Sequence, residues 1–240
     1  MIVLGLDISM TATGWAIAAL KDGELRLLRC GVITTEKNKS KEKVSSTIDS
    51  IRRSHSIYVE LGKVLSSELG LQVDLVCMEA MSWPRNAASA IKMAMAWGAI
   101  APLLAERPLI EVGPVAIKLV ASGKKSASKE EVASGVRALM PKATQKVLKE
   151  FVPKASLQEH CWDALGSILA STKTEKWKLL QAGLSQRKPL KAGSGHAEDF
   201  RYSTFEISQR FREGFDPEKA VQAFASVQDR VAAEMRPPSP

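Results

Sequence analysis

Acidic side chains end two segments of this chain that are typical of buried strands. Asp7 closes the apolar run "MIVLGL", and Glu79 closes "VDLVCM". Burial of a lone carboxylate is unfavourable, so each acid is expected to have a partner. Two carboxylates that lie close together repel each other unless one is protonated or a cation bridges them. Carboxylate oxygens are suitable ligands for Mg²⁺ or Mn²⁺.

A third segment, "SLQEHCWDALGSILAS", adds two further candidate ligands. His160 and Asp163 are three residues apart and share one face of the predicted helix. Ser156 and Glu159 match a capping box, which is expected to occupy Glu159 at the helix start. A cluster of three acids and a histidine can hold two metal ions about 3.5–4 Å apart and support hydrolysis of a phosphodiester bond. The candidate catalytic and metal-binding residues are Asp7, Glu79, His160 and Asp163.

Each of these residues also has an ordinary structural interpretation. Asp7 can cap a turn, and Glu79 can be the exposed last residue of a strand. Asp163 can be a surface acid on an amphipathic helix, and a lone histidine such as His160 is often a packing residue. The metal-site hypothesis therefore depends on elements that bring the four side chains together.

The order of predicted elements provides that convergence. Three strands, "MIVLGLD", "TGWAIAAL" and "ELRLLRCGVIT", form an antiparallel meander with an Asp22-Gly23 hairpin turn. Apolar spacing predicts a helix over 44–69 with Gly70 as its C-cap. The following strand, "VDLVCME", is then expected to lie parallel to the first. Asp7 and Glu79 would meet at the carboxyl edge of adjacent strands, where open α/β sheets place their sites.

The remaining segments complete an α/β fold. They are an apolar helix in "NAASAIKMAMAWGAIAPLLAE", a fifth strand "LIEVGP", a short helix "VAIKLVAS", and a helix "SKEEVASGVRALMP" with a Ser128/Glu131 capping box. The prediction is a mixed five-stranded sheet flanked by helices, within a main domain at 1–172. A basic linker is expected at 173–199, and a C-terminal helical extension with a disordered end at 200–240.

The composition of the chain indicates which classes of partner and which cellular compartment to expect. The net charge of +8 and the pI of about 9.4 favour an anionic partner, most commonly nucleic acid. Cys30, Cys77 and Cys161 form no C-x-x-C pair, which predicts reduced, buried thiols in a cytosolic protein. The first apolar run is too short for a signal peptide or membrane span, so a cytoplasmic location and no membrane partner are expected.

Four segments together resemble the RuvC Holliday-junction resolvases of the RNase H-like superfamily. They are "GLDISMTATGWAI", "MEAMSWPRNAASAIKMAMAWG", "VGPVAIKLVASGKKSASKEEV" and "EHCWDALGSILA". The resemblance implies an RNase H-like fold, a homodimer, Mg²⁺ with Mn²⁺ as a substitute, and branched DNA as substrate. It also implies a bacterial or phage-infected host cytoplasm. Asp7, Glu79 and Asp163 match metal ligands of the family, and His160 stands where members carry Asp or His.

The same resemblance points to DNA-binding residues. Lys118 and Lys129 match two functional lysines, and Lys124 and Lys125 extend the basic segment; a solvated lysine face is the alternative. In the loop after Glu79, the family carries an aromatic wedge. The candidates there are Trp83, which can stack on an unpaired base, and its neighbour Arg85; packing of Trp83 on the following helix is the alternative.

The sequence thus favours a metal-dependent crossover junction endodeoxyribonuclease that cuts symmetrically, in DNA recombination and repair. One alternative is a RuvC-like nuclease for other branched or flapped DNA. Another is a catalytically silent protein that binds branched DNA. An actin-like ATPase would need a second phosphate loop of "DxG" type later in the chain, and the sequence contains none.

Overall fold

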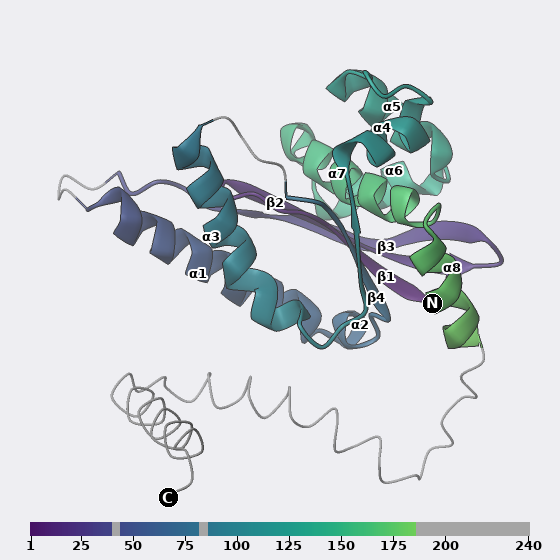
Figure 1. Ribbon diagram of the computed structural model, residues 1–240, viewed down its shortest axis with the longest axis horizontal. Helices are drawn as coiled ribbons and strands as arrows, with labels where there is room; N and C mark the ends of the chain where they lie inside the picture. Colours follow the sequence, from purple (N-terminus) through teal and green to yellow (C-terminus); the bar gives the residue numbers. More distant parts are fainter. Residues whose placement is uncertain (40–43, 82–85, 186–240) are drawn as a thin grey trace, which may run out of the picture. The chain divides into compact units, whose positions relative to one another are not determined.

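Five strands form one mixed sheet in the computed structural model, which describes residues 1–39, 44–81 and 86–185 (Figure 1). The strand order is β3-β2-β1-β4-β5, which places β1 at the centre. The strands are β1 (Ile2–Asp7), β2 (Ala12–Lys21), β3 (Glu24–Thr34), β4 (Leu75–Glu79) and β5 (Leu109–Val112). This architecture confirms the predicted α/β class with a mixed five-stranded sheet flanked by helices.

The first three strands form the expected antiparallel meander. β1 pairs with β2 and β2 pairs with β3, both antiparallel. Asp22 and Gly23 connect β2 and β3 with positive φ angles of 53° and 80°. This backbone is the reason for the Asp-Gly dipeptide, because a type I′ hairpin turn requires positive φ at both central residues.

The crossover to β4 differs from the single helix predicted over 44–69. It contains α1 (Ser46–Leu65) and the short α2 (Glu68–Leu71). The Ser66 hydroxyl donates to the Gly62 carbonyl at 2.7 Å, and the Ser67 hydroxyl accepts from the Gly70 amide at 3.1 Å. One serine therefore ends a helix and the next begins another, so the expected role of Gly70 as a C-cap was wrong.

Strand β4 runs parallel to β1, as the crossover predicted. Leu6 pairs with Met78 in this register, so the next residues along the two strands are Asp7 and Glu79. β4 also pairs in parallel with β5. The two acids consequently end neighbouring central strands at one edge of the sheet.

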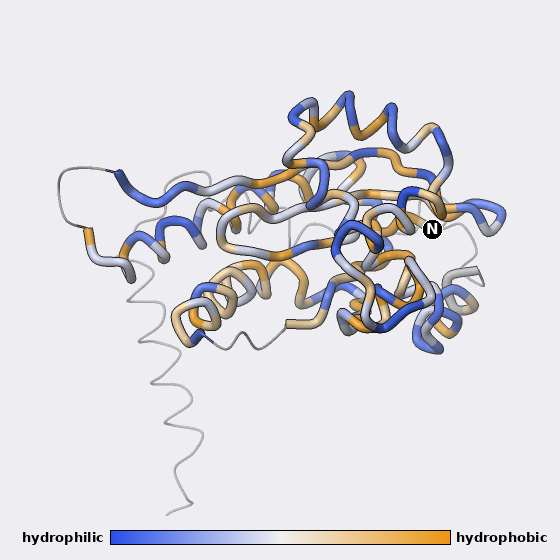
Figure 2. Tube along the Cα trace, turned by 90° about the horizontal axis from the view of Figure 1, so that it is seen from above, coloured by the Kyte–Doolittle hydropathy of each residue, from blue (hydrophilic) through white to orange (hydrophobic). Residues whose placement is uncertain are grey.

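Helices cover both faces of the sheet and close two apolar cores (Figure 1). On one face, α1 packs with α3 (Ala87–Leu104). The other face is covered by α4 (Pro114–Ser122), α5 (Lys129–Leu139), α6 (Ala143–Phe151) and α7 (Ala155–Ser171). Along the flanking helices, hydrophobic and hydrophilic residues alternate (Figure 2), as expected of elements with one buried side.

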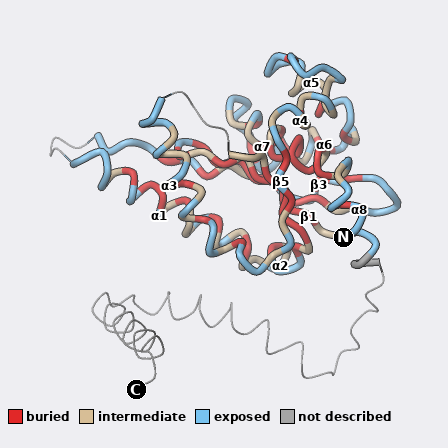
Figure 3. Tube along the Cα trace, viewed as in Figure 1, coloured by how far each residue is buried: buried red, intermediate tan, exposed pale blue. Residues whose placement is uncertain are grey.

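Helix α7 lies directly against the sheet. A Cβ atom at Gly5 of β1 would collide with the carbonyl oxygen of Ala164, and one at Gly14 of β2 would collide with that of His160. Ten of the 17 residues of α7 are buried, and they continue the buried centre of the sheet in Figure 3. Glycine at these two positions therefore lets the helix backbone approach the strands closely.

The chain after α7 continues as α8 (Glu175–Ser185), in the first part of the range 173–199 that was expected to be a linker. Trp177 of α8 is only 3% exposed and joins the core beneath α7. The buried Trp177 side chain holds α8 against the same apolar core that α7 covers. The predicted extension at 200–240 lies outside the described residues, and the domain boundaries remain predictions.

Candidate metal centre

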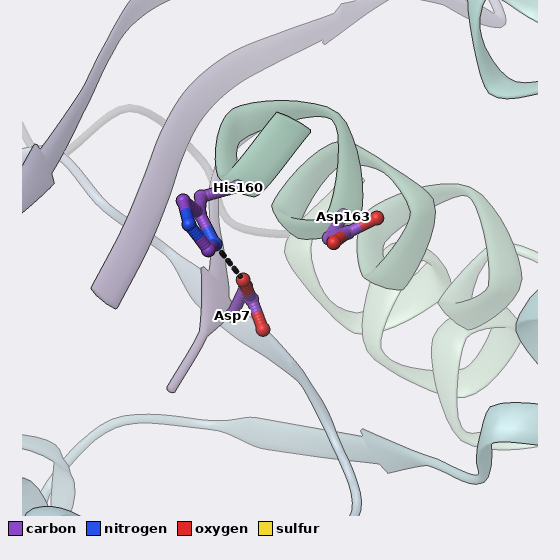
Figure 4. Close-up of side chains that lie close together, drawn as sticks. All are labelled: Asp7, His160 and Asp163. Atoms are coloured by element: carbon purple, nitrogen blue, oxygen red, sulfur yellow. Dashed lines mark hydrogen bonds and ion pairs between the residues drawn. The ribbon is translucent and has the colours of Figure 1, made fainter. Parts of the chain in front are cut away.

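The partner of Asp7 is His160. The imidazole Nδ1 lies 2.9 Å from Asp7 Oδ2, and both side chains are largely buried (Figure 4). Asp7 comes from the end of β1 and His160 from α7, 153 positions later in the chain. The hydrogen bond to Asp7 raises the pKa of His160, and burial opposes this shift. The acid is thus paired, but by a residue that is itself a metal ligand in many proteins.

Asp163 completes a three-residue group around the same point (Figure 4). One ligand atom each from Asp7, His160 and Asp163 lies within 4.8 Å of the others. His160 and Asp163 occupy positions i and i+3 of α7, so one helix contributes both side chains to the same face. The close packing of α7 on Gly5 and Gly14 brings that face to the end of β1.

Glu79 lies close enough to Asp7 and Asp163 for their charges to change its pKa. Burial, followed by the charges of Asp7 and Asp163, raises the pKa of Glu79 to about 6. Burial and the charge of Asp7 also raise the pKa of Asp163 to about 6, although Lys129 and His160 oppose the shift. The three acids therefore repel one another in a poorly solvated place.

These properties fit a divalent cation. The donor set combines carboxylate oxygens, which suit Mg²⁺ and Mn²⁺, with one imidazole, a ligand more typical of transition metals. A bound cation would replace the repulsion among the acids with attraction. The residues that would hold it are Asp7, Glu79, His160 and Asp163.

The turn after Asp7 is held by a cation that the sequence analysis missed. Arg53 of α1 is only 3% exposed, and its guanidinium donates to the Met10 carbonyl at 3.0 Å and to the Thr35 hydroxyl at 2.8 Å. Within the turn, the Thr13 hydroxyl donates to the Ser9 carbonyl at 2.7 Å. The detectable signal was an arginine on the buried face of α1.

Glu159 does not occupy the expected capping box. Helix α7 begins at Ala155 after Lys154, and no side chain caps it. Glu159 instead lies 3.7 Å from the amine of Lys129 and 3.9 Å from Nε2 of His160. The helix starts one residue before Ser156, so the predicted capping register was wrong and the glutamate faces the site.

The predicted basic residues take different positions. Lys129 lies 4.0 Å from Asp163 Oδ2, and the charge of Lys118 acts on Glu79, so both lysines border the acidic group. Lys124 pairs with Glu131 at 3.2 Å, and Lys125 is exposed in the same loop. The Ser128/Glu131 capping box is present as predicted. Trp83 and Arg85 lie outside the described residues.

Comparison with known proteins identifies the family. The family model described as "Crossover junction endodeoxyribonuclease RuvC" matches residues 3–149, more than half of the chain. The chain belongs to the RuvC family. The RuvC of Natranaerobius thermophilus is 30% identical over 142 residues, which cover 58% of this chain and 81% of that protein. The RuvC of Chlorobium phaeobacteroides is 32% identical over 135 residues, covering 55% and 66%.

Solved RuvC structures share the fold. T. thermophilus RuvC in complex with a Holliday junction substrate is 27% identical, with a TM-score of 0.53 over 79% of this chain and 99% of that one. A further Thermus thermophilus RuvC structure is 26% identical, with a TM-score of 0.51 over 79% and 100%. The RuvC family-model match ends before His160 and Asp163, so the placement of those two residues in the site depends on the geometry above.

The electrostatic account makes a prediction about stability without metal. The folded pKa of Asp163, about 6, exceeds its ordinary value of 3.8, so its ionisation destabilises the fold as pH rises through that interval. Asp163→Asn should therefore raise the metal-free free energy of unfolding by about 1–2 kcal/mol at about pH 8, and by less at about pH 5. Urea denaturation in EDTA measures this.

Glu106→Gln is the matched control, because Glu106 is an exposed acid away from the site. It should show no comparable gain. An Asp163→Asn protein that is less stable than wild type at the higher pH would contradict the proposed repulsion among the acids.

Proposed function

We propose that this RuvC-family protein is a Mg²⁺-dependent endonuclease that resolves Holliday junctions by symmetric hydrolysis of phosphodiester bonds. The observation that carries the proposal is the convergence of Asp7, His160 and Asp163 within 4.8 Å, next to Glu79, at one edge of the central sheet. The site would act on DNA in the cytoplasm.

The four residues would share the work of holding divalent cations. When bound, Mg²⁺ or Mn²⁺ activates a water molecule and stabilises the leaving oxygen of an in-line displacement. Asp7 is central, because it ends the middle strand and contacts His160 from α7. Glu79 enters from β4, and Asp163 enters from the helix. Each acid follows a buried residue of its own element, namely Leu6 before Asp7, Met78 before Glu79 and Trp162 before Asp163, so rigid elements would hold the ligands in place.

The basic residues around the acidic group would bind the DNA backbone. Lys129 and Lys118 border the acids and can neutralise phosphates that approach the cations. The exposed Lys124 and Lys125 would extend this contact along the DNA. We also assign Trp83 and Arg85 to the crossover, on the basis of their position in the sequence between Glu79 and α3.

Two alternatives use the same fold. A RuvC-like nuclease that prefers flapped or otherwise branched DNA would keep this acidic set. A protein that binds branched DNA without cutting it would have no need for four converging ligands, so the intact set argues against it. The complex of T. thermophilus RuvC with a Holliday junction favours the four-way junction as the substrate.

We further propose that α3 pairs with a second copy of itself. Helix α3 has the length and the apolar composition of a membrane-spanning helix, with a mean hydropathy of 1.4. Only 17% of its residues are buried inside the protein, so most of this apolar helix is not covered by the rest of the chain. Its exposed residues include a row that recurs every three or four positions, at Ala87, Ile91, Ala94, Gly98 and Ala101, in addition to Ala88, Ser89 and Pro102 at the two ends.

Gly98 supports a helix as the partner. A Cβ atom there would meet nothing within 4 Å, so packing inside the protein does not require glycine at this position. Glycine in a helix interior costs about 1 kcal/mol relative to alanine. Small residues at this spacing permit a second helix to approach closely, and a dimer would present two sites to a nearly two-fold symmetric junction.

The metal-site assignment predicts a separation of cutting from binding. Asp7→Asn should reduce junction cleavage at least about 100-fold, since loss of outer-shell partners alone costs 10–100-fold. Junction binding should persist or strengthen, because a negative charge near the phosphates is removed. Glu79→Gln and Asp163→Asn should behave alike, and Glu106→Gln should cut normally. Nicking assays on junction, flap and duplex DNA measure cleavage.

Normal cutting by all three site variants would show that the site is elsewhere. Faster wild-type cleavage of flaps than of junctions would support the first alternative. Binding by the wild type without any cutting in Mg²⁺ or Mn²⁺ would support the second.

The dimer proposal predicts a change of mass. Gly98→Glu places a charged side chain on the exposed face of α3 and should convert the wild-type dimer into a monomer in light scattering. Ala138→Glu, on an exposed position of α5, should remain dimeric. A wild-type protein that is monomeric at the concentrations used for cleavage would refute the pairing of α3 helices.

A further inference from the structure

Helix α6 carries a row of lysines on the side opposite its core contacts. Thr144 and Leu148 are buried, and the helix packs against the edge strand β3 beside α7 (Figure 1). Lys142, Lys146 and Lys149 are exposed, and the backbone of Lys142 already has helical angles. At 100° per residue, spacings of four and three place these lysines within an arc of about 60°. We call these three residues the α6 lysine row.

The α6 lysine row is unfavourable for the helix itself. Like charges three or four residues apart destabilise a helix by about 0.2–0.5 kcal/mol per pair. A cation at the N-terminal end also opposes the helix dipole. Throughout residues 1–39, 44–81 and 86–185, no carboxylate forms an ion pair with any of the three lysines. Lys149 is in the last turn, where the dipole favours a cation. The mutual repulsion of the row and the position of Lys142 at the helix start remain unfavourable, which points to an external anion.

The chain that follows the α6 lysine row leads toward the edge of the sheet that carries the metal centre. The hydrogen bond and charge of Lys39 lower the pKa of Glu36, and the charge of Lys154, just after α6, adds a smaller contribution. Glu36 follows β3, whose last residue Thr34 pairs with Ala12, at the end of the turn after Asp7. The C-terminal end of α6 is fixed to the same strand, because the Arg29 guanidinium stacks 5.6 Å from the Phe151 ring. The α6 lysine row thus belongs to a helix that packs on β3, the strand whose last residues reach the active edge of the sheet.

The dimensions of the α6 lysine row match a DNA backbone. Lys142 and Lys149 are separated by about 10 Å along the helix axis, at 1.5 Å per residue. That length equals about three base-pair steps of 3.4 Å, measured along the axis of duplex DNA. Exposed amines on a convex helix reach phosphates and not base edges, so the contact would be independent of sequence.

We propose that the α6 lysine row binds the phosphate backbone of a duplex arm leaving the crossover. This inference rests on the proposed function, because the arm is part of the junction held at the metal centre. It adds a DNA-binding surface outside the acidic group and outside the loop of Lys124 and Lys125. Affinity for the junction should then increase with arm length. Its dependence on salt concentration should be steeper than that of a variant without these lysines.

The test replaces the row with glutamine in the full chain, as Lys142→Gln, Lys146→Gln and Lys149→Gln. Binding to a long-armed junction is measured over a sodium chloride series, with EDTA present to prevent cleavage. The slope of log K against log salt should become shallower by about 2.7, which is about 0.9 for each phosphate that a lysine no longer neutralises. The affinity that the wild type gains from long arms over short arms should largely disappear.

A matched control removes the same charge elsewhere, through Lys21→Gln, Lys63→Gln and Lys176→Gln, all at exposed positions on other elements. Its slope should equal that of the wild type. The α6 triple variant should still cut a short-armed junction at the wild-type rate, because none of its changes touches the metal centre.

Two results overturn the inference in distinguishable ways. If the wild type cuts junctions but shares its salt slope and arm-length dependence with the α6 triple variant, the α6 surface does not bind the arm and the proposed function stands. If the wild type cuts no junction, the proposed function fails and this inference fails with it.

Discussion

The close approach of α7 to the sheet is the constraint on which the site depends. Gly5 and Gly14 leave no room for a Cβ atom beneath the backbone of Ala164 and His160. Because the helix backbone rests on the strands, His160 can reach Asp7 at 2.9 Å and Asp163 enters the same group. A helix held further away would leave Asp7 without this partner. The two glycines therefore link the core of the fold to its chemistry.

The electrostatics of the site follow from this packing. The helix that delivers His160 and Asp163 also excludes water, and burial is the largest cause of the raised pKa values of Asp163 and Glu79. The fold thus retains a group of mutually repelling acids, and a divalent cation bound there would relieve this repulsion. On the opposite side of the turn, buried Arg53 holds the segment after Asp7 through the Met10 carbonyl. The repulsion among these acids lowers the stability of the metal-free protein, and the same arrangement of acids would bind a cation.

Sequence patterns were sufficient for the sheet and for the convergence of acids. The helical crossover makes the fourth strand parallel to the first and so places Asp7 beside Glu79. A spacing of three residues places His160 with Asp163 on one helix face. Those arguments use only local periodicity and topology. The role of Glu159 was missed because the capping pattern fits several start positions, and only packing decided that α7 begins at Ala155. The role of Gly14 depends on a contact with His160 that no local pattern encodes.

The most direct test of this account measures metal binding after the helix is displaced. Gly14→Ala adds one methyl group against the backbone of His160, so α7 must shift away from β2. Circular dichroism first establishes that the variant is folded. Titration calorimetry of the folded variant should show Mn²⁺ affinity at least about tenfold weaker than wild type. Gly62→Ala in α1, where the added methyl would lie 3.9 Å from Leu103, should bind normally. Wild-type Mn²⁺ affinity in folded Gly14→Ala would contradict the claim that close packing of α7 builds the site.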